Sequence, residues 1–244
     1  MKNNWTFYPC GEAALTLQWG DEAYSREASQ RILQLAAELR HHPFHGYHDG
    51  VVAYHTLTVH YDPFLLHTHY KPSTRCQDWV KSHLEKLIRQ SSRADLDQAR
   101  HHHIPVYYTS DPGSDLFALS LTLSRTPEEL IRLHCAPIYN IYMVGFLPGF
   151  PYLGTLPPEL VVPRKSKPVL VQPGSVAIAG RQTGIYPLAS PGGWHVLGQT
   201  PIQIFQPEAK IPVLVQAGDT VSFIPITKKE FDQHIRLRNG NTNS

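Results

Sequence analysis

The feature that most constrains this chain is a stretch dense in glycine and proline, between Gly145 and Pro201. Nine of the 16 glycines and ten of the 21 prolines fall there, with apolar runs such as Val176–Ala179 between them. Glycine allows positive φ and close backbone approach, whereas proline fixes φ, so their alternation specifies a rigid, irregular backbone path. Rigid loops on a small β scaffold are frequent binding sites, although tight turns between short strands would give a similar composition.

The overall composition is that of a globular protein. With 244 residues, of which 41% are hydrophobic and 17% charged, the chain is expected to form two domains with real cores. Lys+Arg 22 against Asp+Glu 20 gives no polycation, so we expect no nucleic-acid partner. The N-terminus has no apolar signal core and no run approaches a membrane span, so neither membrane nor secretion is expected. Three widely spaced cysteines fit a reducing compartment, and we predict a cytoplasmic location.

Fifteen histidines are unusual for this length, and several are clustered. A metal site needs converging ligands supported by further hydrogen bonds, whereas these clusters lie beside turn and linker residues. We therefore interpret them as solvated and predict no metal. The clusters are His41, His42, His45 and His48, and then His101, His102 and His103.

The first 90 residues alternate between strand and helix patterns. Strands are predicted at Trp5–Pro9, at Ala13–Trp19 and, as one continuous strand, at Val51–Tyr61. One helix is expected to be capped by Asp21, and a second to open at Ser73 or Thr74. The apolar face of the first is Ala28, Ile32, Leu35 and Leu39, and that of the second is Val80, Leu84, Leu87 and Ile88. This pattern predicts a small α/β sandwich domain over residues 1–90, followed by a linker at 91–103.

A second domain is predicted over residues 104–235, beginning with a strand at Ile104–Tyr108. A short helix is expected at Asp115–Leu123, and Thr126 opens the next one with the capping-box pattern Thr-Pro-Glu-Glu. After Ala136 only short strands and turns remain, which favours a barrel or a sandwich. The fold class is therefore α+β, and residues 236–244 are expected to be a disordered tail.

Familiar catalytic motifs are missing from the sequence. No G-x-S-x-G, H-E-x-x-H or phosphate-binding loop occurs, and Glu159 is the sole acidic residue between Ala136 and Pro207. A pair of catalytic carboxylates within this stretch is therefore excluded, unless the second carboxylate comes from elsewhere. Basic residues and glycine-rich turns would suit a carboxylate or phosphate, although exposed arginine is also common without any ligand. These basic residues are Arg164, Lys165, Lys167, Arg181 and His195.

Other reactive or aromatic side chains in this stretch have simpler explanations. Cys135 follows His134 directly, and adjacent residues at a helix end rarely face one another, so we interpret the thiol as buried and inert. The aromatic residues could either line a pocket or pack in the core. They are Tyr139, Tyr142, Tyr152, Tyr186 and Trp194.

These same residues carry a resemblance to a known family. The chain resembles the B subunit of 5-oxoprolinase, also called the KipI or allophanate hydrolase subunit 1 family, over nearly its whole length. The N-terminal half fits more loosely, through Gly11–Leu15 and Val59–Pro63. In the second half the match runs through His134, Pro137, Tyr139, Tyr142-Met143, Gly145-Phe146, Pro148–Leu153, Pro163-Arg164, Pro173–Val176, Ile178–Gly180, Gln182–Pro187, Ser190–Trp194, Gly198 and Thr200-Pro201.

Three positions depart from the family pattern. Glu12 stands where the family more often has aspartate, which is a mild change. Val169 follows Pro168 where arginine is usual, and Gln199 replaces a frequent arginine. Two potential contacts to an anion are therefore missing, while Arg164 and Arg181 remain.

The resemblance implies a cyclophilin-like β-barrel in the C-terminal domain. It also implies that the chain works with 5-oxoprolinase subunits A and C to open 5-oxoproline to L-glutamate with consumption of ATP, the isolated chain being inactive. Two alternatives stay open, because the family includes an inhibitor of histidine kinase autophosphorylation and domains fused within urea amidolyase-type enzymes. The absence of a complete catalytic set agrees with a site that a partner completes.

The residues expected to form the site follow from this resemblance and from their chemistry. Arg164 or Arg181 would hold the substrate carboxylate or a transferring phosphate, and His134 would orient a proton or make a structural hydrogen bond. Aromatic walls and backbone N–H groups would complete the substrate-binding part. That part comprises Tyr142, Phe146, Pro148, Gly149, Phe150, Gly180, Gln182, Thr183, Gly184 and Tyr186.

Overall fold

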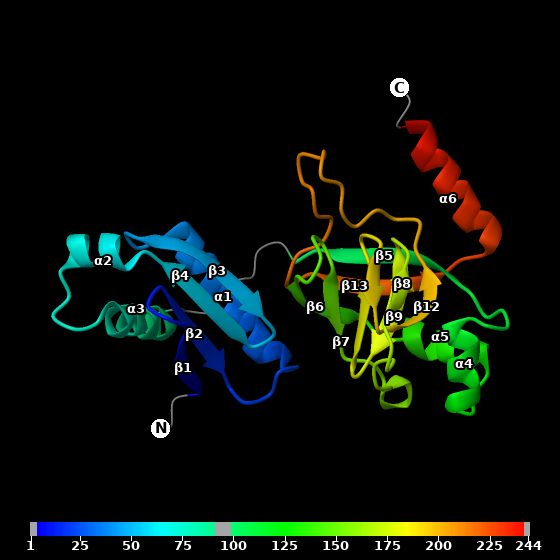
Figure 1. Ribbon diagram of the computed structural model, residues 1–244, viewed down its shortest axis with the longest axis horizontal. Helices are drawn as coiled ribbons and strands as arrows, with labels where there is room; N and C mark the ends of the chain where they lie inside the picture. The colour runs from blue at the N-terminus through cyan, green and yellow to red at the C-terminus, as the bar shows by residue number, and fades with distance from the viewer. Residues whose placement is uncertain (1–3, 91–98, 242–244) are drawn as a thin grey trace. The chain divides into compact units, whose positions relative to one another are not determined.

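A computed structural model describes residues 4–90 and 99–241. The chain divides into two compact units, residues 1–99 and 100–244 (Figure 1). This division falls inside the predicted linker, most of which (91–98) lies outside the described residues. The predicted linker extends too far, however, because His101–His103 begin strand β5 and pair with Thr220–Ser222.

The N-terminal unit is an antiparallel sheet of order β1-β2-β4-β3 with helices packed on it. Its core is formed by the inward side chains of β2 and β4, by Ile32, Leu35 and Leu39 of the first helix, and by Val80 and Leu84 of the third. The predicted apolar faces of both helices are therefore the buried ones. The elements are β1 (Trp5–Pro9), β2 (Ala14–Trp19), α1 (Arg26–His41), β3 (Tyr47–Ala53), β4 (Thr56–Tyr61), α2 (Pro63–Tyr70) and α3 (Cys76–Gln90).

Two local predictions in this unit were wrong. The cap of α1 is Ser25, whose Oγ accepts a hydrogen bond from the backbone N–H of Ala28, and not Asp21. The segment Val51–Tyr61 is a hairpin instead of one strand, because a two-residue turn with Tyr54 at φ 55° separates β3 from β4. A two-residue turn preserves the alternation of apolar and polar positions, so the pattern alone does not reveal it.

Helix α2 was not predicted, and α3 begins at Cys76, after the expected Ser73 or Thr74. The side chain of Asp62 caps α2 by accepting from the N–H groups of Phe64 and Leu65. Proline at the first helical position favours this start. Only Leu66 of α2 is buried, so the helix has no apolar periodicity that a sequence pattern could show.

The C-terminal unit is a closed barrel of strand order β10-β7-β6-β13-β5-β12-β9, which confirms the predicted α+β class with a barrel (Figure 1). Strand β13 pairs in parallel with β5 and antiparallel with β6. Apolar side chains such as Val176 and Ile178 fill the interior. The barrel strands are β5 (His101–Tyr108), β6 (Tyr139–Val144), β7 (Pro151–Gly154), β9 (Ser175–Ala179), β10 (Gln182–Ile185), β12 (His195–Gln199) and β13 (Thr220–Pro225).

Several further elements decorate the barrel. Helix α4 (Asp115–Thr122) precedes α5 (Pro127–Cys135), which begins with the predicted capping box of Thr126 and Glu129. A short 3₁₀ helix, η1, spans Pro158–Leu160. Strands β8 (Val169–Val171) and β11 (Ser190–Gly192) form a separate two-stranded sheet.

The predicted disordered tail is instead largely helical. Helix α6 runs over Lys228–Asn241 and extends away from the barrel (Figure 1). Phe231 is buried and its ring centre lies 5.9 Å from that of Tyr107, and Nη1 of Arg238 donates to the carbonyl of Pro201 at 3.1 Å. These long-range contacts hold a helix whose polar sequence resembles a tail.

Candidate functional site

The glycine- and proline-rich stretch forms a cluster of aromatic rings on the outer face of β9. Val176 and Ile178 point into the barrel, so Ala177 and Ala179 face outward, where Phe150, Tyr186 and Trp194 cover them. The ring centre of Phe150 lies 5.0 Å from that of Tyr186 and 5.5 Å from that of Trp194, both edge to face. We call this group of three rings the aromatic cluster.

Two glycines are required because aromatic rings lie against the backbone. A Cβ at Gly184 would come within 2.7 Å of Cζ of Phe150, and one at Gly192 within 2.4 Å of the Tyr186 hydroxyl. These distances are shorter than any van der Waals contact. Part of the glycine density therefore serves close packing of the aromatic cluster, in addition to turns.

Arg164 is exposed and lies beside the aromatic cluster, with Cζ 6.0 Å from the ring centre of Trp194. Its backbone is held on both sides. Nε2 of His195 donates to the Pro163 carbonyl at 3.0 Å, and the Lys165 N–H donates to the Gly193 carbonyl at 2.7 Å. Within residues 4–90 and 99–241 no carboxylate pairs with Arg164, so its charge is available to a ligand.

Asp115, which the sequence reasoning did not select, fixes this segment from the start of α4. Its Oδ2 accepts from Nζ of Lys165 at 2.5 Å and from the backbone N–H of Val196 at 2.7 Å. The same carboxylate therefore joins the Arg164 segment to β12. An acidic residue such as Asp115 in the first turn of a predicted helix is expected to stabilise that helix. Nothing in the sequence indicates its distant partners, Lys165 and Val196.

The charge of Arg164 acts on two nearby phenols. Burial raises the pKa of Tyr152 and of Tyr186, and the positive charge of Arg164 opposes that rise in both. The backbone N–H of Trp194 also donates to the Tyr186 oxygen. Both hydroxyls therefore stay protonated at neutral pH. Tyr186 is buried, so of these three groups only the exposed Arg164 and the half-buried Tyr152 face a small carboxylate in solvent.

His134 lies elsewhere, in the barrel interior, and is completely buried. Oγ1 of Thr183 donates to the Ala177 carbonyl at 3.1 Å, so it accepts from Nε2–H of His134 at 2.9 Å. Nδ1 of His134 then accepts from the Tyr108 hydroxyl at 2.8 Å. Of the two predicted roles for His134, this geometry fits a structural hydrogen bond and not a proton transfer to substrate.

Cys135 joins the same chain of hydrogen bonds. The Tyr108 hydroxyl has only one proton, which it gives to His134, so the Cys135 thiol donates to the Tyr108 oxygen at 3.2 Å. Burial raises the pKa of the Cys135 thiol, which is the opposite of what a nucleophile needs. His134 and Cys135 thus share Tyr108 as a partner without a hydrogen bond to each other among the described residues, and the thiol is half-buried where full burial was predicted.

The remaining predicted site residues lie on the loop after β6, within β6, and at or near the turn between β9 and β10. Phe146 and Pro148 are exposed on the loop after β6, with Gly149 at φ 83° beside them, whereas Tyr142 is buried in β6. Arg181 is exposed at the turn between β9 and β10. An antiparallel bridge between Val162 and Gly180 places Arg164 and Arg181 on opposite sides of it along the backbone.

The predicted N–H donors of residues 180–184 are committed to the barrel. Gly180 donates to the Val162 carbonyl at 2.6 Å, and Gln182, Thr183 and Gly184 pair with β7 on one side and β9 on the other. The prediction that these backbone N–H groups face a ligand was therefore wrong. Buried β10 is part of the scaffold, because a strand inside a closed barrel uses its backbone groups in both ladders.

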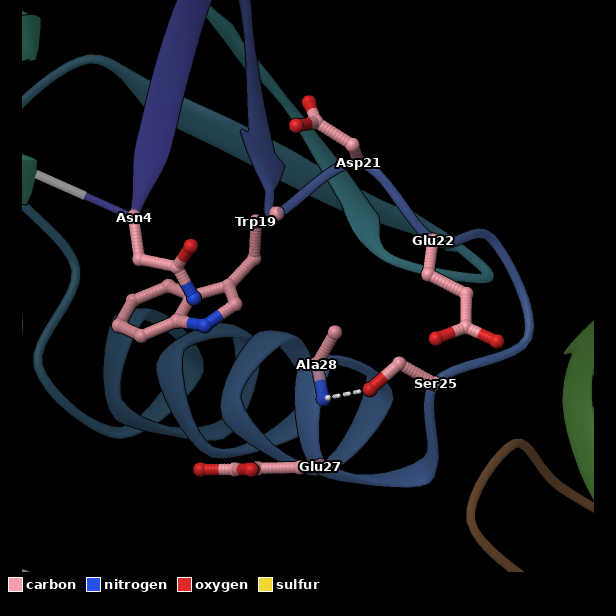
Figure 2. Close-up of a pocket in the computed structure, with 8 residues that line it drawn as sticks. Asn4, Trp19, Asp21, Glu22, Ser25, Glu27 and Ala28 are labelled. Atoms are coloured by element: carbon pink, nitrogen blue, oxygen red, sulfur yellow. Dashed lines mark hydrogen bonds between the residues drawn. The ribbon is translucent and has the colours of Figure 1, made fainter.

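Two surface cavities lie away from Arg164 and the aromatic cluster. One, of about 210 Å³ in the N-terminal unit, has the acidic side chains of Asp21, Glu22 and Glu27 and the indole of Trp19 in its wall (Figure 2). The other, of about 470 Å³, lies between α5 and the end of β13 and includes Cys135 in its wall. Three of the eight residues lining the first cavity are acidic and none is basic, so it does not suit an anion.

In the part of the chain that the structure describes, neither a metal-binding cluster nor a membrane-spanning helix is present. Among the described residues no group of three or more His, Cys, Asp or Glu could hold a metal ion. His101 and His103 are exposed, while Nε2 of His102 lies 2.8 Å from the buried carboxylate of Asp219. In the same part of the chain no helix is both long enough and apolar enough to cross a membrane. The cytoplasmic location remains a prediction.

Comparison with known proteins agrees with this fold. The family model described as carboxyltransferase domain, subdomain C and D, matches residues 5–215. The solved protein TTHA0988 superposes with a TM-score of 0.73 at 36% identity, over 87% of this chain and 40% of that chain. The urea carboxylase of Kluyveromyces lactis shares the fold. It superposes with a TM-score of 0.70 at 15% identity, over 95% of this chain and 22% of that chain.

The two units and the family match define a protein of the carboxyltransferase-domain class. The B subunit of 5-oxoprolinase from Bacillus subtilis (strain 168) is 34% identical over 223 residues, which cover 91% of this chain and 92% of that relative. The chain therefore belongs to the family of 5-oxoprolinase B subunits. It spans well under half of the two solved proteins above, which contain further protein beyond the shared units.

Proposed function

We propose that this chain is the subunit of an ATP-dependent 5-oxoprolinase that converts 5-oxo-L-proline, ATP and water to L-glutamate, ADP and phosphate. It acts with subunits A and C of that enzyme. The name of its Bacillus subtilis relative supports this proposal, as does the absence of a complete catalytic set in the sequence. The proposal depends most on one observation: Arg164 is exposed beside the aromatic cluster and has no carboxylate partner among the described residues.

In this proposal the chain binds and orients, and its partners supply the groups that use ATP. Arg164 takes the carboxylate of 5-oxoproline, next to the buried ring of Trp194 that it lies over. Asp115 and His195 keep the Arg164 segment in place through the contacts described above. Orientation of this kind places the lactam carbonyl toward the partner, where the chemical step occurs.

Reconstitution of the three subunits tests this function. With ATP and 5-oxoproline present, the wild-type mixture should form glutamate, and Arg164→Glu should abolish it because the substrate carboxylate then meets a like charge. Arg125→Glu is the matched control, since Arg125 is an exposed arginine of the same unit in the loop between α4 and α5. Wild-type turnover by Arg164→Glu would contradict the role of Arg164.

The same mixtures separate the alternatives that the family resemblance leaves open. Inhibition of histidine kinase autophosphorylation, with no glutamate formed by the reconstituted subunits, would favour the inhibitor function. ATP-dependent turnover of urea or allophanate in place of 5-oxoproline would favour a urea-related enzyme. Each result contradicts the proposed reaction.

A further inference from the structure

The cavity between α5 and the end of β13 is the larger of the two surface cavities, and its wall contains none of the predicted site residues. Its volume of about 470 Å³ lies within the range of small-molecule sites. Four of its six lining residues lie on α5 at positions i, i+3, i+4 and i+7, so they form one face of that helix. We call this cavity the α5 groove. Its lining residues are Glu128, Ile131, Arg132, Cys135, Ala136 and Pro225.

The floor of the α5 groove is largely apolar. Ile131 and Cys135 are partly buried and pack against the core of the barrel. Another side of α5 carries Leu130 and His134, which are completely buried and hold the helix to the barrel. The groove face is therefore the side of α5 on which an apolar group from solution can be covered.

Two opposite charges border this apolar floor. Glu128 and Arg132 are exposed, and neither makes an ion pair or a side-chain hydrogen bond with any residue that the structure describes. Residues four positions apart are neighbours on a helix, so one small molecule can reach both charges. An acidic first turn and a basic last turn also suit the helix dipole, but the dipole does not require both charges to border one apolar cavity.

We propose that the α5 groove binds a free α-amino acid with an apolar side chain. The carboxylate of Glu128 accepts from its ammonium group, the guanidinium of Arg132 donates to its carboxylate, and its side chain covers Ile131. An α-amino acid carries both charges on one carbon atom, which matches charged partners one helical turn apart, whereas a peptide separates its terminal charges. Binding here involves neither Arg164 nor the proposed reaction.

Cys135 connects the α5 groove to the barrel interior. Its thiol donates to the Tyr108 oxygen at 3.2 Å, and the Tyr108 hydroxyl donates to Nδ1 of His134 at 2.8 Å. A ligand that packs on the thiol therefore contacts one end of this chain of hydrogen bonds. The ring of His134, which no ligand touches, should respond to occupation of the groove.

Calorimetry with the full-length chain tests the class of ligand. L-Phenylalanine should bind, whereas phenethylamine, which lacks the carboxylate, and hydrocinnamate, which lacks the ammonium group, should each bind roughly tenfold more weakly, because one charged hydrogen bond is lost. Equal binding of hydrocinnamate would overturn the amino acid in favour of an apolar carboxylate. No binding of L-phenylalanine would overturn the site.

Two variants place the ligand in the α5 groove. Arg132→Gln should raise the Kd for L-phenylalanine roughly tenfold, and Ala136→Trp should abolish binding because the indole fills the groove. Arg125→Gln is the matched control, since Arg125 is an exposed arginine in the loop before α5, and it should leave the Kd unchanged. Wild-type binding by both Arg132→Gln and Ala136→Trp would overturn the location.

Thiol alkylation followed by mass spectrometry gives an independent measure of the location. Saturating L-phenylalanine should slow alkylation of Cys135 and leave that of Cys10, an exposed thiol of the N-terminal unit, unchanged. The ring-nitrogen NMR signals of His134 should shift in the same titration. Equal protection of the two thiols, or unchanged signals from His134 at saturation, would overturn the contact with Cys135.

Folding and self-association are controlled with the same variants. A lower melting temperature in Ala136→Trp would leave the decision to Arg132→Gln, which changes only an exposed side chain. Self-association of the wild-type chain that Ala136→Trp abolishes would overturn the amino acid in favour of a second copy of the chain in the groove.

Discussion

At the scale of single residues, the barrel interior depends on one buried histidine. His134 is fully buried between the Tyr108 hydroxyl and Thr183, and the orientation of every proton in this chain of hydrogen bonds follows from the Ala177 carbonyl at its end. Burial lowers the pKa of His134 to about 3. A neutral histidine with both ring nitrogens paired is well accommodated, whereas the imidazolium would have to donate at Nδ1, which has no acceptor ready.

This burial makes stability depend on pH. In the unfolded chain His134 titrates near its usual pKa of about 6.5, so between that value and about 3 only the unfolded state binds the proton. Stability is therefore lost as pH falls through this window, at roughly 1.4 kcal/mol per pH unit. The free energy of opening β9 and β10, measured by amide exchange, should fall by roughly 2–3 kcal/mol between pH 6.5 and pH 4.5.

The variant His134→Gln isolates this contribution from that of the carboxylates. Glutamine can donate and accept but does not titrate, so the variant should be less stable near neutral pH and show a shallower loss on acidification. An identical slope in both proteins would show that His134 is not the group responsible.

At the scale of elements, the barrel closes because certain strands approach unusually closely. A bulge between Val196 and Gly198 shifts the register of β12 against β9, and the same strand pairs with β5 at Gly198 and Tyr108. A Cβ at Gly198 would lie 2.4 Å from the Tyr107 carbonyl oxygen. A glycine inside a strand is a known sign of a bulge or close approach, and both occur here.

Replacing this glycine should weaken the barrel. Gly198→Ala should reduce the free energy of unfolding by about 3 kcal/mol, because the obstructing atoms belong to the backbone of β5 and cannot rotate away. Gly145→Ala is the control: its Cβ would lie 3.4 Å from the flexible end of Met143, and the change should stay within about 1 kcal/mol. Equal effects of the two substitutions on urea unfolding would contradict this account.

At the scale of the whole molecule, the chain has a separate core in each unit. Leu57 is buried between the sheet and helices of residues 1–99, and Ile178 is buried inside the barrel. Each unit has its own apolar cluster, and therefore its own source of stability. Arg164 and the aromatic cluster both belong to the barrel unit.

Separate cores predict separate responses to core mutations. Leu57→Ala and Ile178→Ala should each cost about 2–5 kcal/mol, from lost burial and the remaining cavity. Hydrogen exchange followed by mass spectrometry should show faster exchange only in the unit that carries the substitution. Acceleration across both units by either variant would indicate that they unfold together.

Much of the fold could be predicted because it is encoded locally. The apolar stripe of Ile32, Leu35 and Leu39, the capping box at Thr126 and the strands around them all follow from periodicity and from side chain to backbone hydrogen bonds within a few residues. The barrel fold and the family were predicted from the resemblance, because an ordered set of motif residues spans the second half of the chain. The hairpin turn at Tyr54 and helix α6 were missed, because their local patterns fit another structure equally well.

The sequence by itself determined the two-unit α+β organisation, the family and the candidate role of Arg164. Only the tertiary structure decided that Arg164 lies beside Trp194, that Asp115 holds its segment, and that His134 is sealed inside the barrel. The physical reason is the separation along the sequence between the residues that interact. Helix caps and periodic faces depend on neighbours in the chain, whereas Asp115 and Val196 meet across 81 positions, where strand pairing and packing alone select the partner.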